Sequence, residues 1–402
     1  MIDWSAHYAT RATRIAASEI RELLKLLDRA ELISFAGGIP DPTLFPRQEI
    51  AAAYARILGD PIRGGAALQY SVSEGYRPLR EWLAAYMGER GVDCGPDNIL
   101  VTNGSQQALD FIAKLFVSPG DPILVARPTY LGALQAFNAY EPNYDLLPGP
   151  DNNRTAESFG AASGAPPKLA YAMPEFANPT GTTLSLRDRL SLLETARALD
   201  IAVIEDAAYE RLRYDGEPIA SLLALDAEAS GGIEQSRVVY CGTFSKTIVP
   251  GLRIGWIAAP QEVIHRLVLV KQASDLHTGT LPQIVMHEVA PVVLERQTAK
   301  IRAAYSARRD AMLGALARHM PPGVQWTRPE GGMFVWVTLP ERMDAAALLP
   351  LAIEEAKVAF VPGRAFHMDG SGHNTLRLNF SLNGPAAIAE GIGRLAALIP
   401  RD

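Results

Sequence analysis

Short apolar runs rich in branched residues alternate with helical patterns through the middle of the chain. The runs are Ile99 to Thr102, Pro122 to Val125, Lys168 to Tyr171, Ile201 to Glu205 and Val238 to Tyr240. Helical patterns lie between them, as in residues 103–112 and 187–199. Strands that are apolar throughout are buried on both faces, and this alternation favours parallel strands joined by helices. The sequence therefore predicts an α/β fold with a mostly parallel sheet covered by helices.

The pattern changes beyond Pro282. A long charged helical region from Val289 to Arg318 precedes three further apolar runs, at residues 332–337, 358–363 and 376–380. Near the N-terminus, residues 14–27 have helical spacing and predict an amphipathic helix, whereas the polar stretch 149–167 predicts a loop. We therefore expect a large domain over residues 46–289. Residues 1–45 and 290–402 are expected to form a smaller α+β domain.

The composition is typical of a globular protein of about two domains. The chain has 402 residues, 48% of them hydrophobic, and a net charge of −6 without a basic run, which argues against nucleic-acid binding. Its two cysteines form neither a metal-ligand spacing nor a disulfide framework. The start of the chain lacks the features of a secretory signal, and no apolar run reaches the ~18 residues of a membrane span. We expect a cytoplasmic protein without a metal site.

Lys246 is the residue whose surroundings say most about chemistry. It follows a predicted buried strand, residues 237–241, and a turn, residues 242–245, so it stands at the carboxyl edge where open α/β sheets bind ligands. Arg253 follows seven positions later, at the start of the next apolar run. A lysine can hold pyridoxal 5'-phosphate (PLP) by a Schiff base while an arginine and hydroxyl groups bind the phosphate. Most lysines are solvated surface charges, and only the setting of Lys246 favours the cofactor site.

Two further motifs follow predicted strands. Gly104, Ser105 and Gln106 open a helix, so their backbone N–H groups and the helix dipole can bind a phosphate; the alternative is an ordinary N-cap with a tight turn. Asp206 ends the strand formed by residues 202–205. There it can bond the pyridine nitrogen and keep the ring protonated, or else cap a helix that follows.

Three more polar or aromatic side chains are expected at the same edge. Tyr209 comes three residues after Asp206 and can bond the phenolic oxygen of the cofactor. Asn178 points its amide from a turn that Pro179 stiffens, and Tyr130 follows another strand and can stack on the cofactor ring. Each of them alone is more often structural. Their joint occurrence at the ends of successive strands favours a PLP site.

Eight runs spread over nearly the whole chain form a specific combination. They are Ile20 to Leu26, Phe35 to Pro40, Leu68 to Ser71, Gly104 to Leu109, Asn178 to Gly181, Phe244 to Lys246, Asp275 to Thr278 and Gly331 to Trp336. With these runs the chain resembles the fold type I PLP enzymes of the class I/II aminotransferases. It is similar in particular to the bacterial 2-aminoadipate aminotransferases and the related kynurenine/2-aminoadipate aminotransferases. The resemblance implies an aspartate aminotransferase-like fold with a large PLP-binding domain.

The resemblance also implies how the matching positions bind the cofactor. Lys246 would attach it covalently, and Asp206 would hold the pyridine nitrogen. Tyr209 and Asn178 would bind the phenolic oxygen. The phosphate would be bound by Ser105, Gln106, Thr243, Ser245 and Arg253, helped by Tyr70 from the neighbouring subunit. The family therefore implies a homodimer whose interface Tyr70 crosses.

The substrate would be held from the other side of the cofactor. Arg377 would grip the α-carboxylate by a two-pronged contact, for which a guanidinium is suited; the alternative is a surface salt bridge. Gly38 would line the pocket at its turn. Ser18 and Arg21 share one face of the predicted N-terminal helix, and the resemblance implies that Arg21 meets the distal carboxylate of acidic substrates.

The chain departs from the family pattern at two places. Thr243 stands where serine is more usual and keeps the hydroxyl. Glu175, Phe176 and Ala177 precede Asn178 as less familiar residues, and this second departure bears on side-chain specificity.

The activity that the resemblance implies is ping-pong transamination. It would move an amino group between an L-amino acid of the 2-aminoadipate, glutamate, leucine or aromatic type and a 2-oxo acid. Two alternatives remain: a PLP-dependent lyase, racemase or decarboxylase with the same cofactor contacts, and a ligand-sensing domain of a transcriptional regulator. The regulator would need a DNA-binding module before residue 35, and 34 residues do not accommodate one.

Overall fold

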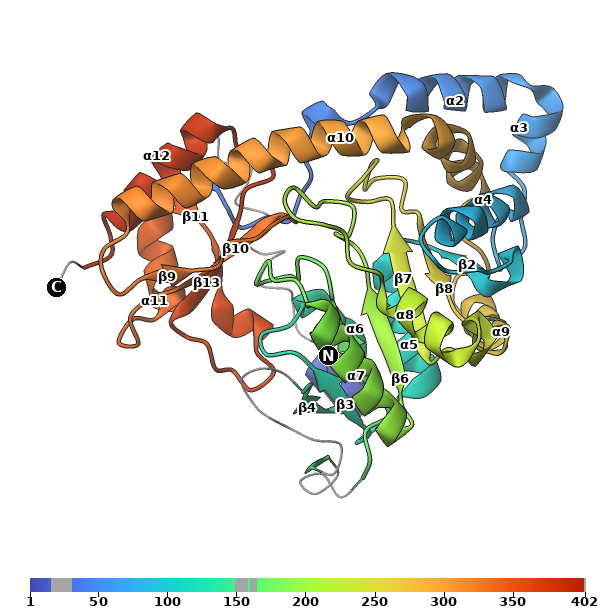
Figure 1. Ribbon diagram of the computed structural model, residues 1–402, viewed down its shortest axis with the longest axis horizontal. Helices are drawn as coiled ribbons and strands as arrows, with labels where there is room; N and C mark the ends of the chain where they lie inside the picture. The colour runs from blue at the N-terminus through green and yellow to red at the C-terminus, as the bar shows by residue number, and fades with distance from the viewer. Residues whose placement is uncertain (16–30, 149–157, 160–164, 401–402) are drawn as a thin grey trace.

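A seven-stranded sheet forms the centre of the larger lobe in the computed structural model, which describes residues 1–15, 31–148, 158–159 and 165–400 (Figure 1). Its strand order is β2-β8-β7-β6-β5-β3-β4. Strand β8 is antiparallel to both neighbours, and all other neighbouring strands are parallel. The strands are β2 (Ile99–Thr102), β3 (Pro122–Val125), β4 (Asn143–Leu146), β5 (Leu169–Ala172), β6 (Ala202–Asp206), β7 (Val238–Thr243) and β8 (Gly255–Ala258). The predicted mostly parallel sheet is confirmed.

Both faces of this sheet are buried, which explains why its strands are apolar throughout. In β5, Leu169 and Tyr171 belong to the hydrophobic cluster on one face, while Ala170 and Ala172 belong to the cluster on the other. The edge strand β4 is only partly buried and carries polar residues. The sequence analysis did not predict β4, because its mixed polar and apolar residues do not form a continuous apolar run.

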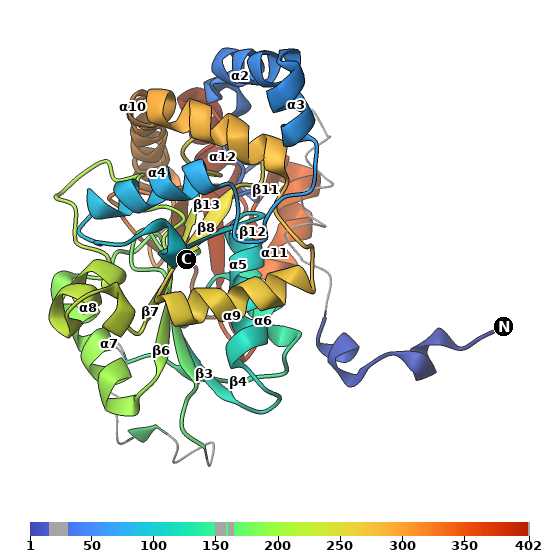
Figure 2. The ribbon, with the colours of Figure 1, turned by 90° about the vertical axis from the view of Figure 1, so that its right-hand side faces the viewer.

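Helices cover the two faces (Figures 1 and 2). Helices α5, α6 and α9 contribute to one hydrophobic cluster, and α4, α7, α8 and the first half of α10 contribute to the other. Within the described ranges, none of the helices is both long enough and apolar enough to cross a membrane. The helices of this lobe are α2 (Arg47–Gly59), α3 (Pro61–Ala67), α4 (Arg77–Gly88), α5 (Ser105–Phe116), α6 (Leu131–Asn138), α7 (Leu186–Leu199), α8 (Leu222–Ser230), α9 (Gln261–Gln272) and α10 (Thr280–His319).

The smaller lobe contains an antiparallel sheet of order β12-β13-β10-β9 and a short parallel pair, β1 with β11. Because β1 comes from the N-terminal part of the chain and β11 from the C-terminal part, this lobe joins two segments that are far apart in the sequence. The elements are β1 (Ile33–Ser34), β9 (Gln325–Trp326), β10 (Phe334–Thr338), α11 (Ala345–Leu351), β11 (Val358–Ala359), β12 (Val361–Pro362), β13 (Thr375–Asn379) and α12 (Pro385–Ala396).

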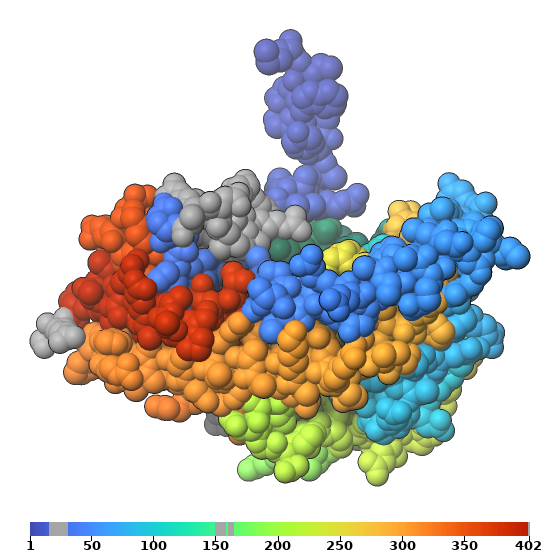
Figure 3. Space-filling model, turned by 90° about the horizontal axis from the view of Figure 1, so that it is seen from above, coloured from blue at the N-terminus to red at the C-terminus, as the bar shows by residue number. Residues whose placement is uncertain are grey.

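Helix α10 joins the lobes and runs along the whole molecule (Figures 1 and 3). It starts at Thr280, earlier than the predicted Val289. Pro282 does not prevent this, because it lies in the first turn, where proline is tolerated. It also contains Pro291. The expected boundary between residues 289 and 290 lies inside this helix, so the division into domains stays a prediction. The predicted N-terminal helix lies mostly outside the described residues; its first residue, Arg14, ends a 3₁₀ helix, Thr10–Arg14.

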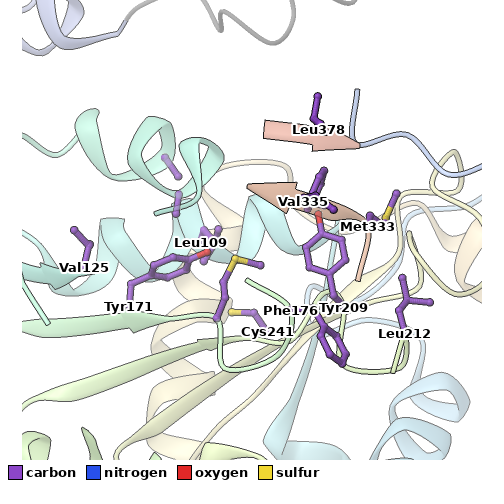
Figure 4. Close-up of a cluster of buried hydrophobic side chains, with 14 of the residues drawn as sticks. Leu109, Val125, Tyr171, Phe176, Tyr209, Leu212, Cys241, Met333, Val335 and Leu378 are labelled. Atoms are coloured by element: carbon purple, nitrogen blue, oxygen red, sulfur yellow. The ribbon is translucent and has the colours of Figure 1, made fainter. Parts of the chain in front are cut away.

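One hydrophobic cluster connects the lobes. Tyr209 and Cys241 of the large lobe belong to the same cluster as Val335 and Leu378 of the small lobe (Figure 4). Tyr209 also packs edge-on against Phe334, with 5.6 Å between the ring centroids. The two lobes thus share one hydrophobic core.

A buried ion network supports the loop that follows β5. Glu175 is 6% exposed, and its two carboxylate oxygens lie 2.5 Å from Arg189 and 2.6 Å from Arg213. Arg189 also donates hydrogen bonds to the carbonyls of Leu184 and Ala220. The Glu175 side chain therefore connects the loop after β5 to Arg189 of α7 and to Arg213. Both carboxylate oxygens of Glu175 are engaged by arginines, and the bearing of this position on side-chain specificity stays a prediction.

Substituting Glu175→Gln should destabilise the fold, because it leaves two arginines without their shared carboxylate. Removing one partner of a buried ion pair costs about 3–5 kcal/mol. The matched control is Glu288→Gln, since Glu288 also joins two arginines, Arg56 and Arg63, but at the surface. That loss should stay at or below about 1 kcal/mol. Urea unfolding of both variants measures the free energy of unfolding. Equal losses of this free energy would show that the buried Glu175 network stabilises the fold no more than the surface pairs of Glu288.

Candidate active site

Lys246 lies at the carboxyl edge of the sheet, just after β7. Its Nζ donates a hydrogen bond of 2.8 Å to the carbonyl of Gly38 and lies 5.8 Å from the ring centroid of Tyr209. Burial, together with the positive charges of Arg377 and Arg253, lowers the pKa of Lys246 to about 8, and Asp206 acts in the opposite direction. The neutral, nucleophilic amine is therefore accessible near physiological pH.

Asp206 ends β6 and is 2% exposed. Its Oδ2 accepts a hydrogen bond of 2.9 Å from the hydroxyl of Tyr171, and its Oδ1 accepts a longer one of 3.3 Å from the backbone N–H of Ala208. Burial raises the pKa of Asp206 to about 6, whereas the hydrogen bonds and Lys246 lower it. No helix follows Asp206 directly, so the alternative role as a helix cap is not supported.

Tyr171 is a site residue that sequence reasoning missed. It is 1% exposed, and burial raises the pKa of its hydroxyl far above the ordinary value. In the sheet it pairs with Ile204, two residues before Asp206, and the two-residue period of the strand places Ile204 and Asp206 on the same face. The sequence contains no direct signal for this register. The contact with Asp206 therefore became visible only in the folded sheet.

A chain of hydrogen bonds connects the two lobes across the site. Asn178 shares a side-chain hydrogen bond with Tyr209, and its Oδ1 accepts a bond of 2.8 Å from Arg377 Nη1. Arg377 Nη2 donates to the carbonyl of Ala36 at 2.7 Å. The phenyl ring of Phe334, another residue not predicted, lies 4.3 Å from the guanidinium carbon of Arg377. Predicted residues from distant parts of the chain are thus brought together.

Arg377 is a buried cation. It is 1% exposed, and burial lowers its pKa to about 10. Among the described residues no carboxylate pairs with it, and its Nε has no hydrogen-bond partner. A surface salt bridge, the alternative considered for this arginine, is therefore not what the described part of the chain shows. Because an isolated buried charge is costly, the arrangement suits an incoming carboxylate.

The start of α5 and Arg253 form an anion cradle. Gly104 is the N-cap residue with φ of +77°, and no side chain caps the helix there. Arg253 Nη2 donates to the carbonyl of Asn103 at 3.1 Å, so close to Gly104 that a Cβ on this glycine would lie 2.3 Å from the guanidinium. Helix N–H groups, the helix dipole and an exposed arginine can together bind a phosphate. Ser105, the first residue of the helix, is partly exposed here.

The hydroxyl groups of Thr243 and Ser245 lie just ahead of Lys246. Thr243 Oγ1 donates to Ser245 Oγ at 2.9 Å and accepts from the Ser245 backbone N–H at 3.1 Å. The predicted pair of hydroxyls is thus preorganised by its own hydrogen bonds. Both residues are buried.

Gln106, in the first turn of α5, and Tyr130, just before α6, contact each other. The amide of Gln106 donates to the carbonyl of Gly132 at 2.6 Å and accepts a weak bond of 3.4 Å from the Tyr130 hydroxyl. The side chain of Gln106 therefore holds the start of α6, and only its backbone N–H is oriented by α5 toward an anion. Tyr130 lies directly against Gly132, where a Cβ would be 2.4 Å from its ring.

The remaining predicted residues are Gly38, which contacts Lys246, Tyr70, which lies at the surface, and two residues outside the described chain. Gly38 contributes the carbonyl that Lys246 contacts. Tyr70 is 79% exposed and packs edge-on against His277 at 5.9 Å between ring centroids. Ser18 and Arg21 lie outside the described residues.

These groups fit PLP. The cofactor needs an amine to attach to, an anion for its pyridine nitrogen, a donor near its phenolic oxygen and a phosphate cradle. Lys246, Asp206, Tyr209 and the uncapped start of α5 beside Arg253 supply one of each.

Comparisons with known proteins agree with this chemistry. The family model described as aminotransferase class I and II matches residues 40–395. The aromatic-amino-acid aminotransferase 1 of Thermococcus litoralis is 42% identical over 409 residues, covering 100% of this chain and 96% of that protein. The 2-aminoadipate transaminase of Thermus thermophilus is 42% identical over 398 residues, covering 98% and 96%.

A solved structure also matches nearly the whole chain. The α-aminoadipate aminotransferase from Thermus thermophilus, crystallised with N-(5'-phosphopyridoxyl)-L-leucine, superimposes with a TM-score of 0.89 at 40% identity, covering 99% of this chain and 98% of that one. The predicted fold, cofactor and enzymatic class are thereby confirmed. The chain belongs to the class I and II aminotransferases, the PLP-dependent transaminases of fold type I.

Proposed function

We propose that Lys246 binds PLP covalently and is the catalytic residue of this aminotransferase. The observation that carries the proposal is the place of its amine, just after β7 at the carboxyl edge of the sheet, 2.8 Å from the carbonyl of Gly38 and 5.8 Å from the ring centroid of Tyr209. When bound, the cofactor supplies an electron sink for the bond that breaks at the substrate α-carbon. With a substrate held at this site, the Lys246 amine would take up the α-proton of the substrate and would hold it for return in the second part of the transfer.

The other predicted residues hold and orient the reactants. Asp206 keeps a positive charge on the pyridine nitrogen, and Tyr209 and Asn178 bind the phenolic oxygen. Arg377 binds the substrate α-carboxylate, for which its lack of a carboxylate partner among the described residues is the support. The phosphate is bound by Gly104, Ser105, Gln106, Thr243, Ser245 and Arg253, with Tyr130 against the ring.

We propose an amino donor of the 2-aminoadipate, glutamate, leucine or aromatic type, and a 2-oxo acid as acceptor. The support is that relatives at 42% identity are named for aromatic amino acids and for 2-aminoadipate, and that the superimposed structure holds a leucine adduct. Ser18, Arg21 and Gly38 are proposed to line the side-chain pocket. A lyase, racemase or decarboxylase would share the cofactor contacts, but these relatives are named aminotransferases.

We also propose a cytoplasmic homodimer in which Tyr70 reaches the partner's phosphate site. The support is the exposure of Tyr70 together with its apolar neighbours Leu68, at 73%, and Val72, at 55%. Apolar side chains gathered on one surface are typical of a protein interface. Arg253, at the cradle, is also exposed in the single chain and would be covered by such a partner.

Borohydride reduction of the enzyme should fix the cofactor on Lys246, and Lys246→Ala should bind PLP without turnover. Because the pKa of this lysine is lowered to about 8, its amine is neutral above pH 8 and protonated below. The rate at which the apo-enzyme takes up PLP should therefore rise with pH and be half-maximal near 8, not above 10 as for an ordinary lysine. Peptide mapping that finds the reduced cofactor elsewhere would refute the assignment.

Asp206→Asn and Tyr171→Phe should form a graded pair. Asparagine keeps a hydrogen-bonding group but removes the charge, so kcat should fall about a hundredfold or more while PLP affinity changes less. Phenylalanine removes a hydrogen bond that lowers the pKa of Asp206. The acidic limb of the kcat profile of Tyr171→Phe should therefore move to higher pH. An unshifted profile would mean that Tyr171 has only a packing role.

Arg21→Ala should lower kcat/KM about ten- to a hundredfold for 2-aminoadipate and glutamate, because a charge-assisted contact is lost. Leucine and phenylalanine should be affected much less. Arg11→Ala, an exposed arginine in the same N-terminal segment, serves as the control. A uniform change across all four substrates in Arg21→Ala would show that this residue does not recognise the side chain.

A further inference from the structure

A buried lysine lies behind the phosphate cradle. Lys271, near the end of α9, is 0% exposed, and its Nζ lies 3.0 Å from both carboxylate oxygens of Asp275. It also donates to Gln107 Oε1 at 3.1 Å. Burial lowers the pKa of Lys271, and the bond to Asp275 raises it. The ammonium group is thus satisfied within a compact polar network.

Asp275 connects this lysine to the loop that starts α5. Its Oδ2 accepts a hydrogen bond of 2.6 Å from Asn103 Nδ2 and one of 2.8 Å from Gln107 Nε2. Gln107 Oε1 in turn accepts from the Asn103 backbone N–H at 2.9 Å. Asn103 is therefore held at its side chain and at its backbone.

The loop held in this way is one wall of the cradle. The carbonyl of Asn103 accepts the hydrogen bond from Arg253 Nη2, and the next residue is Gly104 at the start of α5. A shift of Asn103 would move both the helix N–H groups and the guanidinium that face a phosphate. Asp275 lines the same surface pocket as Asn103 and Arg253, and its hydrogen bonds reach the cradle through Asn103 and Gln107.

Stability alone does not account for a lysine in this position. Burying an ammonium group costs free energy that its partner only partly offsets, and apolar side chains of similar volume are often as stable. A network that is fully hydrogen-bonded instead restricts a loop to one conformation. The restrained loop here is the one that carries Gly104.

We propose that Asp275, paired with Lys271, is a positioning residue that holds Asn103 so that the start of α5 and Arg253 bind the PLP phosphate. The inference rests on the phosphate-binding role proposed above for these two elements. In this role Asp275 acts through Asn103 and does not contact the cofactor itself.

The test compares PLP with pyridoxal, which lacks the phosphate, in titrations of the apo-enzyme. Asp275→Asn should weaken PLP binding about ten- to a hundredfold, because a charge-assisted network is broken, and leave pyridoxal binding unchanged. Asn103→Ala keeps the Lys271–Asp275 pair intact and removes the direct bond from the Asn103 side chain to Asp275, while the backbone N–H of residue 103 still bonds Gln107. It should show the same phosphate-dependent loss, and this second variant guards against misfolding of the first.

Asp226→Asn is the matched control. Asp226 is 1% exposed and accepts hydrogen bonds from Ser236 Oγ at 2.9 Å and from the Arg237 backbone at 2.8 Å, but it is not connected to the cradle by these bonds. The Asp226→Asn variant should have a lower thermal stability, and its ratio of PLP affinity to pyridoxal affinity should be unchanged.

Two outcomes would overturn the proposal: equal losses for PLP and pyridoxal in Asp275→Asn, or no loss for either. If the wild-type enzyme itself bound PLP no more tightly than pyridoxal, the cradle assignment would fail instead, so the two failures are distinguishable.

Discussion

The burial of the central sheet on both faces is the constraint on which the rest of the structure depends. With helices packed against each face, the carboxyl edge is where side chains of the strand ends and following loops can meet a ligand. Asp206, Asn178 and Lys246 all stand at or just after strand ends. The site is therefore a consequence of the topology, and each residue follows a different strand.

The site consists largely of charged groups in poor contact with water. Burial raises the pKa of Asp206 and lowers the pKa of Lys246 and of Arg377. In a region of low polarity, electrostatic interactions between charges are stronger than in water. A ligand with complementary charges therefore binds more favourably there than at the surface. The same physics explains why Glu175 and Lys271, which take no direct part, are paired so closely.

The substrate anchor belongs to both lobes. Arg377 lies on β13 of the small lobe, but its guanidinium bonds Asn178 of the large lobe and the carbonyl of Ala36 from the N-terminal part of the chain. Its geometry thus depends on how the lobes are joined by α10 and by the shared hydrophobic cluster (Figure 4). A substrate carboxylate bound there would contact an assembly and not a single domain.

The sequence alone determined the α/β class, most strands of the large sheet, and the positions of Lys246, Asp206 and Gly104, because these depend on local patterns: apolar runs, turn residues and helix starts. The residues at the strand ends also pointed to the cofactor, and the resemblance to a family added the role of Arg377. Only the tertiary structure revealed that Tyr171 bonds Asp206, that Glu175 is engaged by two arginines and that Asp275 holds Asn103. The reason is physical: each contact joins residues that are separated in the chain, and the choice of neighbouring strands and the packing of loops, which bring them together, are decided only when the whole chain folds.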